Sequence, residues 1–358
     1  MPPVFLILLL VLLGCGSQDS VVAAVFGTAT PILDIGGDGP DGMPVLLAVN
    51  GAARVGTTLV VSDPSAQVIR FFDAEGRQVR MVGRQGNGPG EFQMISWLGA
   101  CGGDSIYVVD IRQDRVTVLG PEGEFARQFT PLSNRAFQWV CSRQGGMIGI
   151  MGPRIFRTPA NGYGRSPPDT AAVVRIGARG DTATVIPAVQ IGEQRSMGLL
   201  THVALTEERI WVGTGESEYL IGHSLDGAPR ESLAVGTTRR KMTRPEYERG
   251  VDLLLATIPG SDPLRPMMLE FPMPEYFPHF GSIHAAPDGT IWIVTSMMTD
   301  SVTTLRALAR DGRRIGDLRL PHQVTIYEVG NDYFVASHEA ADGQPHVVVY
   351  AVRWGRDP

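Results

Sequence analysis

The chain has 358 residues, with 37 acidic and 31 basic side chains and a formal net charge of −6. Hydrophobic residues make up 43% and charged residues 19%, which excludes an intrinsically disordered chain. The mild acidity argues against a protein that neutralises nucleic-acid phosphates, so we expect no nucleic-acid partner. The 43 glycines and 26 prolines favour many short elements joined by turns over a helix bundle.

The chain opens on an apolar run from Val4 to Leu13, which is too short to span a bilayer and has the length of a signal-peptide core. It ends at Gly14-Cys15, which resembles the lipobox of bacterial lipoproteins, where the cysteine receives a diacylglycerol group. The resemblance implies lipidation at Cys15, a membrane anchor and a place in the cell envelope, periplasmic or at the cell surface. The segment before Val4 departs from the pattern, because it has no Lys or Arg. The alternative to lipidation is an ordinary secretory signal with an incidental cysteine. The implied organisation is a signal peptide over 1–14, a tether over 15–27 and a folded domain over 28–358.

Short β-rich runs recur along the rest of the chain at the spacing of a four-stranded propeller blade. The six strongest begin at Leu59, Ile106, Ile148, Ile210, Ile291 and Tyr333, in steps of 47, 42, 62, 81 and 42 residues. Three of the steps fit one blade, and the two long ones require insertions. We interpret the runs as the second strands of six blades.

Five glycine turns run in step with these strands, at Gly76, Gly123, Gly180, Gly227 and Gly312. Glycine supplies the positive φ of tight hairpins, so we place these turns between the third and fourth strands of five blades. In the sixth blade the chain ends on the third strand, over 347–352, and a strand within Thr28 to Ile35 is expected to complete it. This closure removes the open sheet edges of the ring.

The sequence thus predicts an all-β fold, a six-bladed β-propeller with one short helical insertion between blades four and five. The expected blades span 44–82, 94–129, 135–186, 199–234, 280–320 and 322–353. The alternative of two β-sandwich domains lacks a linker-like change of composition between the halves.

The segment Gly83 to Phe92 resembles the G-x-x-G-x-G-P-G-E-F connection of bacterial six-bladed propellers of the NHL and TolB-like groups. Asp110 followed by Arg115 and Val116 is similar to those groups too. The resemblance implies a bacterial propeller lipoprotein. Because the glycines open no helix and no βαβ unit follows, we interpret the segment as a structural crossover with Phe92 between blades, rather than a phosphate loop.

Two long insertions, over 151–170 and 237–279, are expected on the same face of the ring, because strands alternate in direction within a blade. The second insertion predicts a helix that begins near Thr243 and carries an apolar stripe of Val251, Leu254, Leu255 and Ile258. This helix and the aromatic segment over 271–280 form either a lid over the central channel or a structure packed on the rim. Both alternatives stay open.

The candidate ligand-binding residues come from these insertions, where arginine and aromatic side chains gather. They are Arg154, Arg157, Tyr163, Arg165, Tyr247, Tyr276 and His279. The arginines suit an anionic sugar or carboxylate through charge-assisted hydrogen bonds.

No catalytic or metal motif is present, so we expect no cofactor. The seven histidines form no metal-binding pattern, although His279, His284 and His322 are a conceivable set. Glu216, Glu218 and Asp300 are conceivable calcium ligands, and solvated carboxylates are the simpler interpretation.

Cys101 and Cys141 lie 40 residues apart, one blade period, near the ends of adjacent innermost strands. They form either a disulfide between blades or two buried thiols, and the narrow geometry of a bridge favours the thiols slightly.

The functional hypothesis is a membrane-anchored, extracytoplasmic binding or scaffold propeller that recognises a protein, peptide or glycan on its insertion-bearing face. The alternative is a metal-dependent hydrolase, lactonase- or esterase-like, or a lyase, with its site at the channel mouth; this rests on fold analogy alone.

Overall fold

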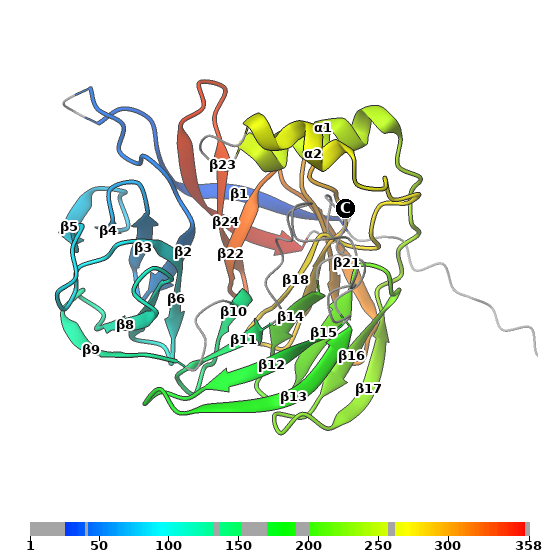
Figure 1. The fold of residues 1–358 in the computed structure, drawn as a ribbon, viewed down its shortest axis with the longest axis horizontal. Helices are drawn as coiled ribbons and strands as arrows, with labels where there is room; N and C mark the ends of the chain where they lie inside the picture. Colours follow the sequence, from blue (N-terminus) through cyan, green and yellow to red (C-terminus); the bar gives the residue numbers. More distant parts are fainter. Residues whose placement is uncertain are drawn as a thin grey trace, which may run out of the picture.

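The computed structural model describes residues 26–39, 42–131, 136–151, 170–190, 201–256 and 262–354. Six four-stranded blades surround a central axis, with the chain running around the ring from blade to blade (Figure 1). The expected six-bladed propeller is therefore confirmed.

Blades one to four are separate antiparallel sheets. From the axis outward, blade one contains β2 (Gly51–Val55), β3 (Thr58–Asp63), β4 (Val68–Phe72) and β5 (Gln78–Val82), and blade two contains β6 (Ile95–Cys101), β7 (Ser105–Asp110), β8 (Arg115–Leu119) and β9 (Phe125–Phe129). Blade three contains β10 (Ala136–Cys141), β11 (Met147–Met151), β12 (Thr170–Ile176) and β13 (Thr182–Gln190). Blade four contains β14 (Thr201–Leu205), β15 (Ile210–Thr214), β16 (Tyr219–His223) and β17 (Pro229–Ala234).

Blades five and six form one eight-stranded sheet, in which the outermost strands of the two blades are paired. Blade five contains β18 (Ser282–Ala285), β19 (Ile291–Val294), β20 (Thr304–Leu308) and β21 (Arg314–Arg319), and blade six contains β22 (Thr325–Val329), β23 (Tyr333–Glu339), β24 (Pro345–Trp354) and β1 (Phe26–Ile35). All six predicted second strands occupy that position.

The ring closes through β1, the fourth strand of the blade whose other three strands come from the C-terminal end. It pairs antiparallel with β24 from Gly27 opposite Trp354 to Ile35 opposite Val347. At its other edge it meets β21 in parallel, with Phe26 opposite Asp317. The predicted closing strand is confirmed, and it joins the two ends of the domain.

The five predicted hairpin glycines adopt φ between 81° and 94° and connect the third and fourth strands of blades one to five. Because a residue with a Cβ is strained in this region, glycine is required at these turns. The ring has two faces.

The turn face carries these hairpins and those between first and second strands. The insertion face carries the links from second to third strands and from blade to blade.

The crossover from Gly83 to Phe92 is structural, as predicted. Phe92 is fully buried among side chains of blades one and two. The Glu91 carboxylate accepts hydrogen bonds from the Gly88 amide and the Arg84 side chain. Arg115 donates to the carbonyls of Asn87, Gly88 and Glu91. These bonds hold the crossover against blade two, and the Glu91 carboxylate takes up the Gly88 amide.

Cys101 and Cys141 are joined by a disulfide, with their Cα atoms 4.8 Å apart. The slight preference for free thiols was therefore wrong. The first strands of blades two and three end side by side at the turn face, where the Gly102 amide also donates to the Ser142 carbonyl at 2.9 Å. A disulfide indicates an oxidising, extracytoplasmic environment.

Replacing Cys101 and Cys141 together with alanine should lower the free energy of unfolding by about 4 kcal/mol, because the bridge closes a 40-residue loop in the unfolded chain. Denaturant unfolding of the variant and of the oxidised parent measures the loss. A reductant should reproduce the loss in the parent and change nothing in the variant. An unchanged unfolding midpoint, or two free thiols in the parent, would contradict the prediction.

The link between blades four and five contains helix α1 (Arg244–Ala256), a short 3-10 turn (Asp262–Leu264) and helix α2 (Arg265–Leu269). Thr243 and Glu246 form the N-terminal cap of α1, since the Glu246 carboxylate accepts from the Thr243 amide at 2.9 Å. Across the residues that the structure covers, none of the helices is both long and apolar enough to cross a membrane.

Candidate functional site

The insertion between blades four and five closes at its base through an antiparallel clasp, formed by residues 237–242 and 275–279. The Met242 amide donates to the Glu275 carbonyl at 3.0 Å, and the Phe277 amide donates to the Arg240 carbonyl at 2.8 Å. Lys241 and Tyr276 are bridge partners between the two segments.

Helix α1 packs on the rim and not over the axis. Its buried side chains Tyr247, Val251 and Leu255 lie in one cluster with Phe277 and with Met297, which belongs to the link between β19 and β20 of blade five. Figure 1 shows α1 and α2 at the periphery of the ring. Of the two alternatives for this segment, the described part of the insertion therefore has the rim arrangement.

Tyr247 is a core residue of the insertion. It is fully buried, and its hydroxyl donates to the Met268 and Phe271 carbonyls at 3.0 and 3.2 Å. Its expected role as a ligand contact is wrong, because its side chain faces the helix packing instead of solvent. Leu254 is partly buried, and Ile258 lies outside the described residues.

The clasp brings cations onto aromatic rings. The guanidinium of Arg239 lies 5.4 Å and the Lys241 ammonium 5.9 Å from the centre of the Tyr276 ring. Arg240 lies 4.1 Å from the centre of the Phe277 ring and pairs with Asp300 at 3.3 Å. Such contacts contribute about 0.5–1 kcal/mol each at exposed sites.

Arg239 and Tyr276 form a partly exposed cation–π pair in the clasp. Lys241 pairs with Glu275 at 3.8 Å, whereas no acidic side chain among the described residues lies within ion-pair distance of Arg239. The Arg239 Nε donates to the Phe277 carbonyl at 2.9 Å, which orients the guanidinium over the ring. Tyr276 is partly exposed.

His279 supports the clasp. Its amide donates to the Gly215 carbonyl at 2.7 Å, and its Nδ1 lies 3.2 Å from the Thr237 carbonyl oxygen. Burial lowers the pKa of His279, and the nearby charge of Arg239 adds to this effect. A neutral imidazole adds no charge beside the Arg239 guanidinium.

The proposed calcium carboxylates do not gather in one place. Asp300 accepts from the Met297 amide at 2.7 Å and pairs with Arg240, so its oxygens are engaged within blade five. Among the residues described, no group of three or more His, Cys, Asp or Glu side chains is arranged to hold a metal ion. His279, His284 and His322 are not brought together.

Two histidines on neighbouring inner strands were not identified as a pair from the sequence. His202 is on β14 and His284 on β18, and burial lowers the pKa of each to about 4. The charge of His202 further lowers the pKa of His284. His202 lies against Phe280, with ring centres 5.9 Å apart, and the His284 Nε2 is 3.0 Å from the Ser282 hydroxyl. Both rings are neutral at pH 7.

A second row of histidines crosses blade six at the insertion face. His322 stacks on His338 with ring centres 4.4 Å apart, and His338 lies 5.3 Å from His346. The His346 Nδ1 is 2.8 Å from an Asp34 carboxylate oxygen, which links β24 to β1. These residues are far apart in the sequence, so no local pattern reveals the row.

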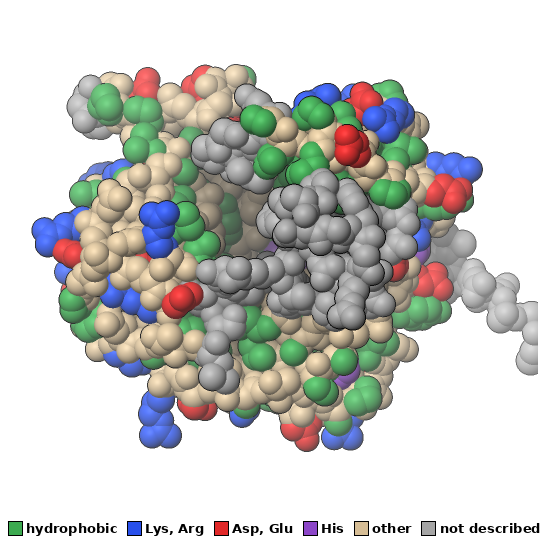
Figure 2. Space-filling model, in the orientation of Figure 1, with side chains coloured by type: hydrophobic (Ala, Val, Ile, Leu, Met, Phe, Trp, Pro, Cys, Tyr) green, Lys and Arg blue, Asp and Glu red, His purple; other side chains and the backbone are tan. Residues whose placement is uncertain are grey.

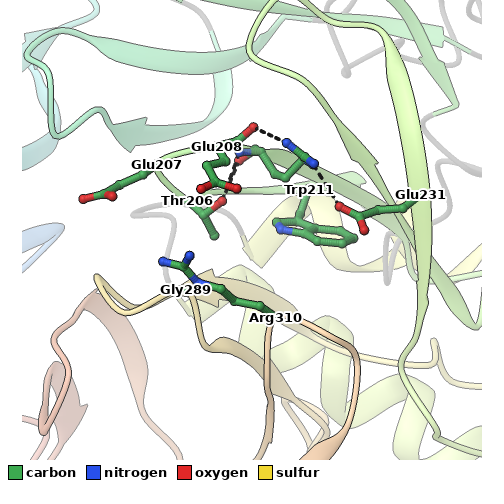
Figure 3. Close-up of a pocket in the computed structure, with 8 residues that line it drawn as sticks. Thr206, Glu207, Glu208, Trp211, Glu231, Gly289 and Arg310 are labelled. Atoms are coloured by element: carbon green, nitrogen blue, oxygen red, sulfur yellow. Dashed lines mark hydrogen bonds and ion pairs between the residues drawn. The ribbon is translucent and has the colours of Figure 1, made fainter.

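A groove of about 180 Å³ lies between blades four and five on the turn face (Figure 3). The turn from Thr206 to Arg209 forms one wall, and Gly289 and Arg310 of blade five form the other. Trp211 of β15, which is 4% exposed, also lines the groove. No local sequence pattern reveals this groove, because it depends on how two blades meet.

The remaining candidate residues cannot be placed. Arg154, Arg157, Tyr163, Arg165 and Cys15 lie outside the described residues. On the face shown in Figure 2 the molecule is hollowed near the middle of the ring.

Comparisons with known proteins show the fold alone. No protein-family profile and no curated protein matches the chain. Solved structures with a similar architecture include two proteins from Bacteroides species. One is a Bacteroides fragilis protein inferred to be exported, with 13% identity, a TM-score of 0.53, and coverage of 92% of this chain and 96% of the other. The other is a member of the DUF4221 family from Bacteroides vulgatus, with 11% identity, a TM-score of 0.54, and coverage of 92% and 99%.

The fold and the disulfide thus define the chain as a six-bladed β-propeller with the features of an extracytoplasmic protein. At 11–13% identity, the two relatives establish its architecture and not its ligand.

Proposed function

We propose that this chain is a binding or scaffold propeller displayed outside the cytoplasm, held at a membrane by a lipid on Cys15, and that its insertion face recognises a protein, peptide or glycan. The observation that carries the proposal is the Arg239–Tyr276 pair of the clasp. Arginine and tyrosine are enriched among the residues that dominate binding interfaces, because each combines a wide contact area with hydrogen bonding.

Two further observations support this function. Arg239 is oriented by its bond to the Phe277 carbonyl, so little conformational freedom remains to be lost when a partner binds. The exported neighbour and the disulfide both fit a protein that works outside the cytoplasm.

A photo-crosslinking experiment tests the proposal. The Tyr276 side chain is replaced with p-benzoyl-phenylalanine in the full chain, which is then irradiated with envelope material from its own cell. We expect discrete adducts at this position that disappear when Arg239→Ala is added. The control is the same probe at Phe125, which is 44% exposed on the outer strand of blade two.

Identical adducts at Tyr276 and Phe125, or adducts that persist in the Arg239→Ala variant, would contradict a specific insertion-face site. Metal analysis of the purified protein addresses the hydrolase or lyase alternative. A bound divalent metal at one equivalent per chain would favour that alternative over the binding function.

A further inference from the structure

The groove between blades four and five presents two opposite charges that do not meet. Glu208 belongs to the β14–β15 turn of blade four and Arg310 to the β20–β21 turn of blade five. Neither side chain has an ion-pair partner within 4.0 Å among the described residues. Figure 3 shows Arg310 projecting from the blade-five side towards the turn that carries Thr206 and Glu208.

Arg310 is held in this direction by the turn beneath it. Its Nε donates to the Asp288 carbonyl at 2.9 Å. Gly289 has a φ of 89°, and a Cβ at this position would lie 2.1 Å from the Arg310 Nε. The turn therefore needs glycine both for its backbone and for the space that the arginine occupies. Among the residues that the structure describes, neither terminal nitrogen of this guanidinium has a hydrogen-bond or ion-pair partner, so both can contact a ligand.

The other charges on the blade-four wall are already engaged. The Arg209 Nε donates to Glu231 at 2.9 Å, and its Nη1 donates to the Glu208 backbone carbonyl at 3.0 Å. Glu207 lies 3.7 Å from Arg143 of blade three. After these pairs are set aside, one carboxylate and one guanidinium remain, Glu208 and Arg310.

We infer that this groove binds a small zwitterion, an α-amino acid of about the size of alanine. The ligand's carboxylate accepts two hydrogen bonds from the terminal nitrogens of Arg310, and its ammonium group donates to the Glu208 carboxylate. Both are charge-assisted hydrogen bonds, and the planar guanidinium matches a carboxylate in particular.

The charge of the groove selects this class, and its size admits it. The groove has a volume of about 180 Å³, which leaves room for a molecule as small as alanine. A ligand with a negative charge alone would be repelled by the three carboxylates around the groove, and a ligand with a positive charge alone would be repelled by the two guanidiniums. A zwitterion satisfies both walls without adding net charge. This site lies on the turn face and does not depend on the insertion-face proposal.

Calorimetric titration of the purified chain tests the inference, with L-alanine as the probe and propionate and ethylamine as single-charge controls. We expect alanine to bind at least tenfold more tightly than either control. Arg310→Gln and Glu208→Gln should each weaken alanine binding at least tenfold. The matched control variants are Arg313→Gln, on the same hairpin as Arg310, and Glu122→Gln, an exposed glutamate on the β8–β9 hairpin of blade two. These should bind alanine as the parent does.

Retained circular dichroism spectra establish that the variants fold. Three outcomes would overturn the inference: no detectable binding of alanine, glycine or serine; propionate binding as tight as alanine; or alanine binding unchanged in both Arg310→Gln and Glu208→Gln. The photo-crosslinks at Tyr276 should be unaffected by these groove variants, which separates failure of this site from failure of the insertion-face proposal.

Discussion

A chain that begins at Gly37, and therefore lacks β1, is expected not to form the closed ring. Without β1, the whole β24 edge from Val347 to Trp354 loses its hydrogen-bonded partner. The loss also removes Ile35, which is 3% exposed and packs with blades one and six. The free energy of unfolding of a folded domain is only about 5–15 kcal/mol. The loss of a whole closing strand should therefore cost more free energy than the folded state has to lose.

The matched control is a chain that begins at Phe26, which keeps every described strand. Size-exclusion chromatography and thermal unfolding compare the two. We expect a cooperative transition for the control, and aggregation or no cooperative transition for the shorter chain, because an unpaired apolar edge recruits other strands. A monomeric shorter chain with the same melting temperature would show that β1 is dispensable.

Acid is expected to destabilise the protein well above the range in which carboxylates titrate. The pKa values of His202 and His284 fall from 6.5 when unfolded to about 4 when folded. The unfolded chain therefore binds more protons between pH 6.5 and pH 4, and stability rises with pH across this window. The stabilisation is fully present above pH 6.5 and is lost as the pH falls towards 4, on the order of 3 kcal/mol for each ring.

The double variant His202→Gln, His284→Gln tests this expectation, because glutamine stays neutral. Its unfolding free energy should depend less on pH between 6.5 and 4 than that of the parent, whereas the two should respond alike above pH 7. His223→Gln is the control, since His223 lies on β16, away from the inner strands. Equal pH slopes for parent and double variant would mean that other groups cause the acid sensitivity.

The repeating parts of the fold were predictable because each depends on a few neighbouring residues. Gly123 sits in a hairpin with φ of 84°, and the flanking β-rich runs are close enough in sequence to pair across it. Phe92 follows a glycine-rich crossover and fills the space between two consecutive blades. In both cases the interaction partners lie within one or two blades along the chain.

Predictions about single side chains succeeded less often, because they depend on which surface a segment packs against. Tyr247 lies in an aromatic, arginine-rich segment and was expected to face a ligand, but the helix turns it into the core. The stacked His322, His338 and His346 come from three different strands or links. No pattern of sequence spacing predicts such a row, since the pairing of the strands in the sheet sets the distances between the three rings.

The amino-acid sequence by itself determines six blades, a closing strand at the N-terminal end of the domain, and hairpin turns that require glycine. Local backbone preferences and strand-length periodicity suffice for these features, and they act over tens of residues at most. Only the packing of neighbouring blades decided which distant side chains lie close together. The pairs concerned are Cys101 with Cys141, His202 with His284, and Glu208 with Arg310 across the groove. Each of these pairs joins different blades, and the distance across a blade interface depends on the packing of all the side chains between.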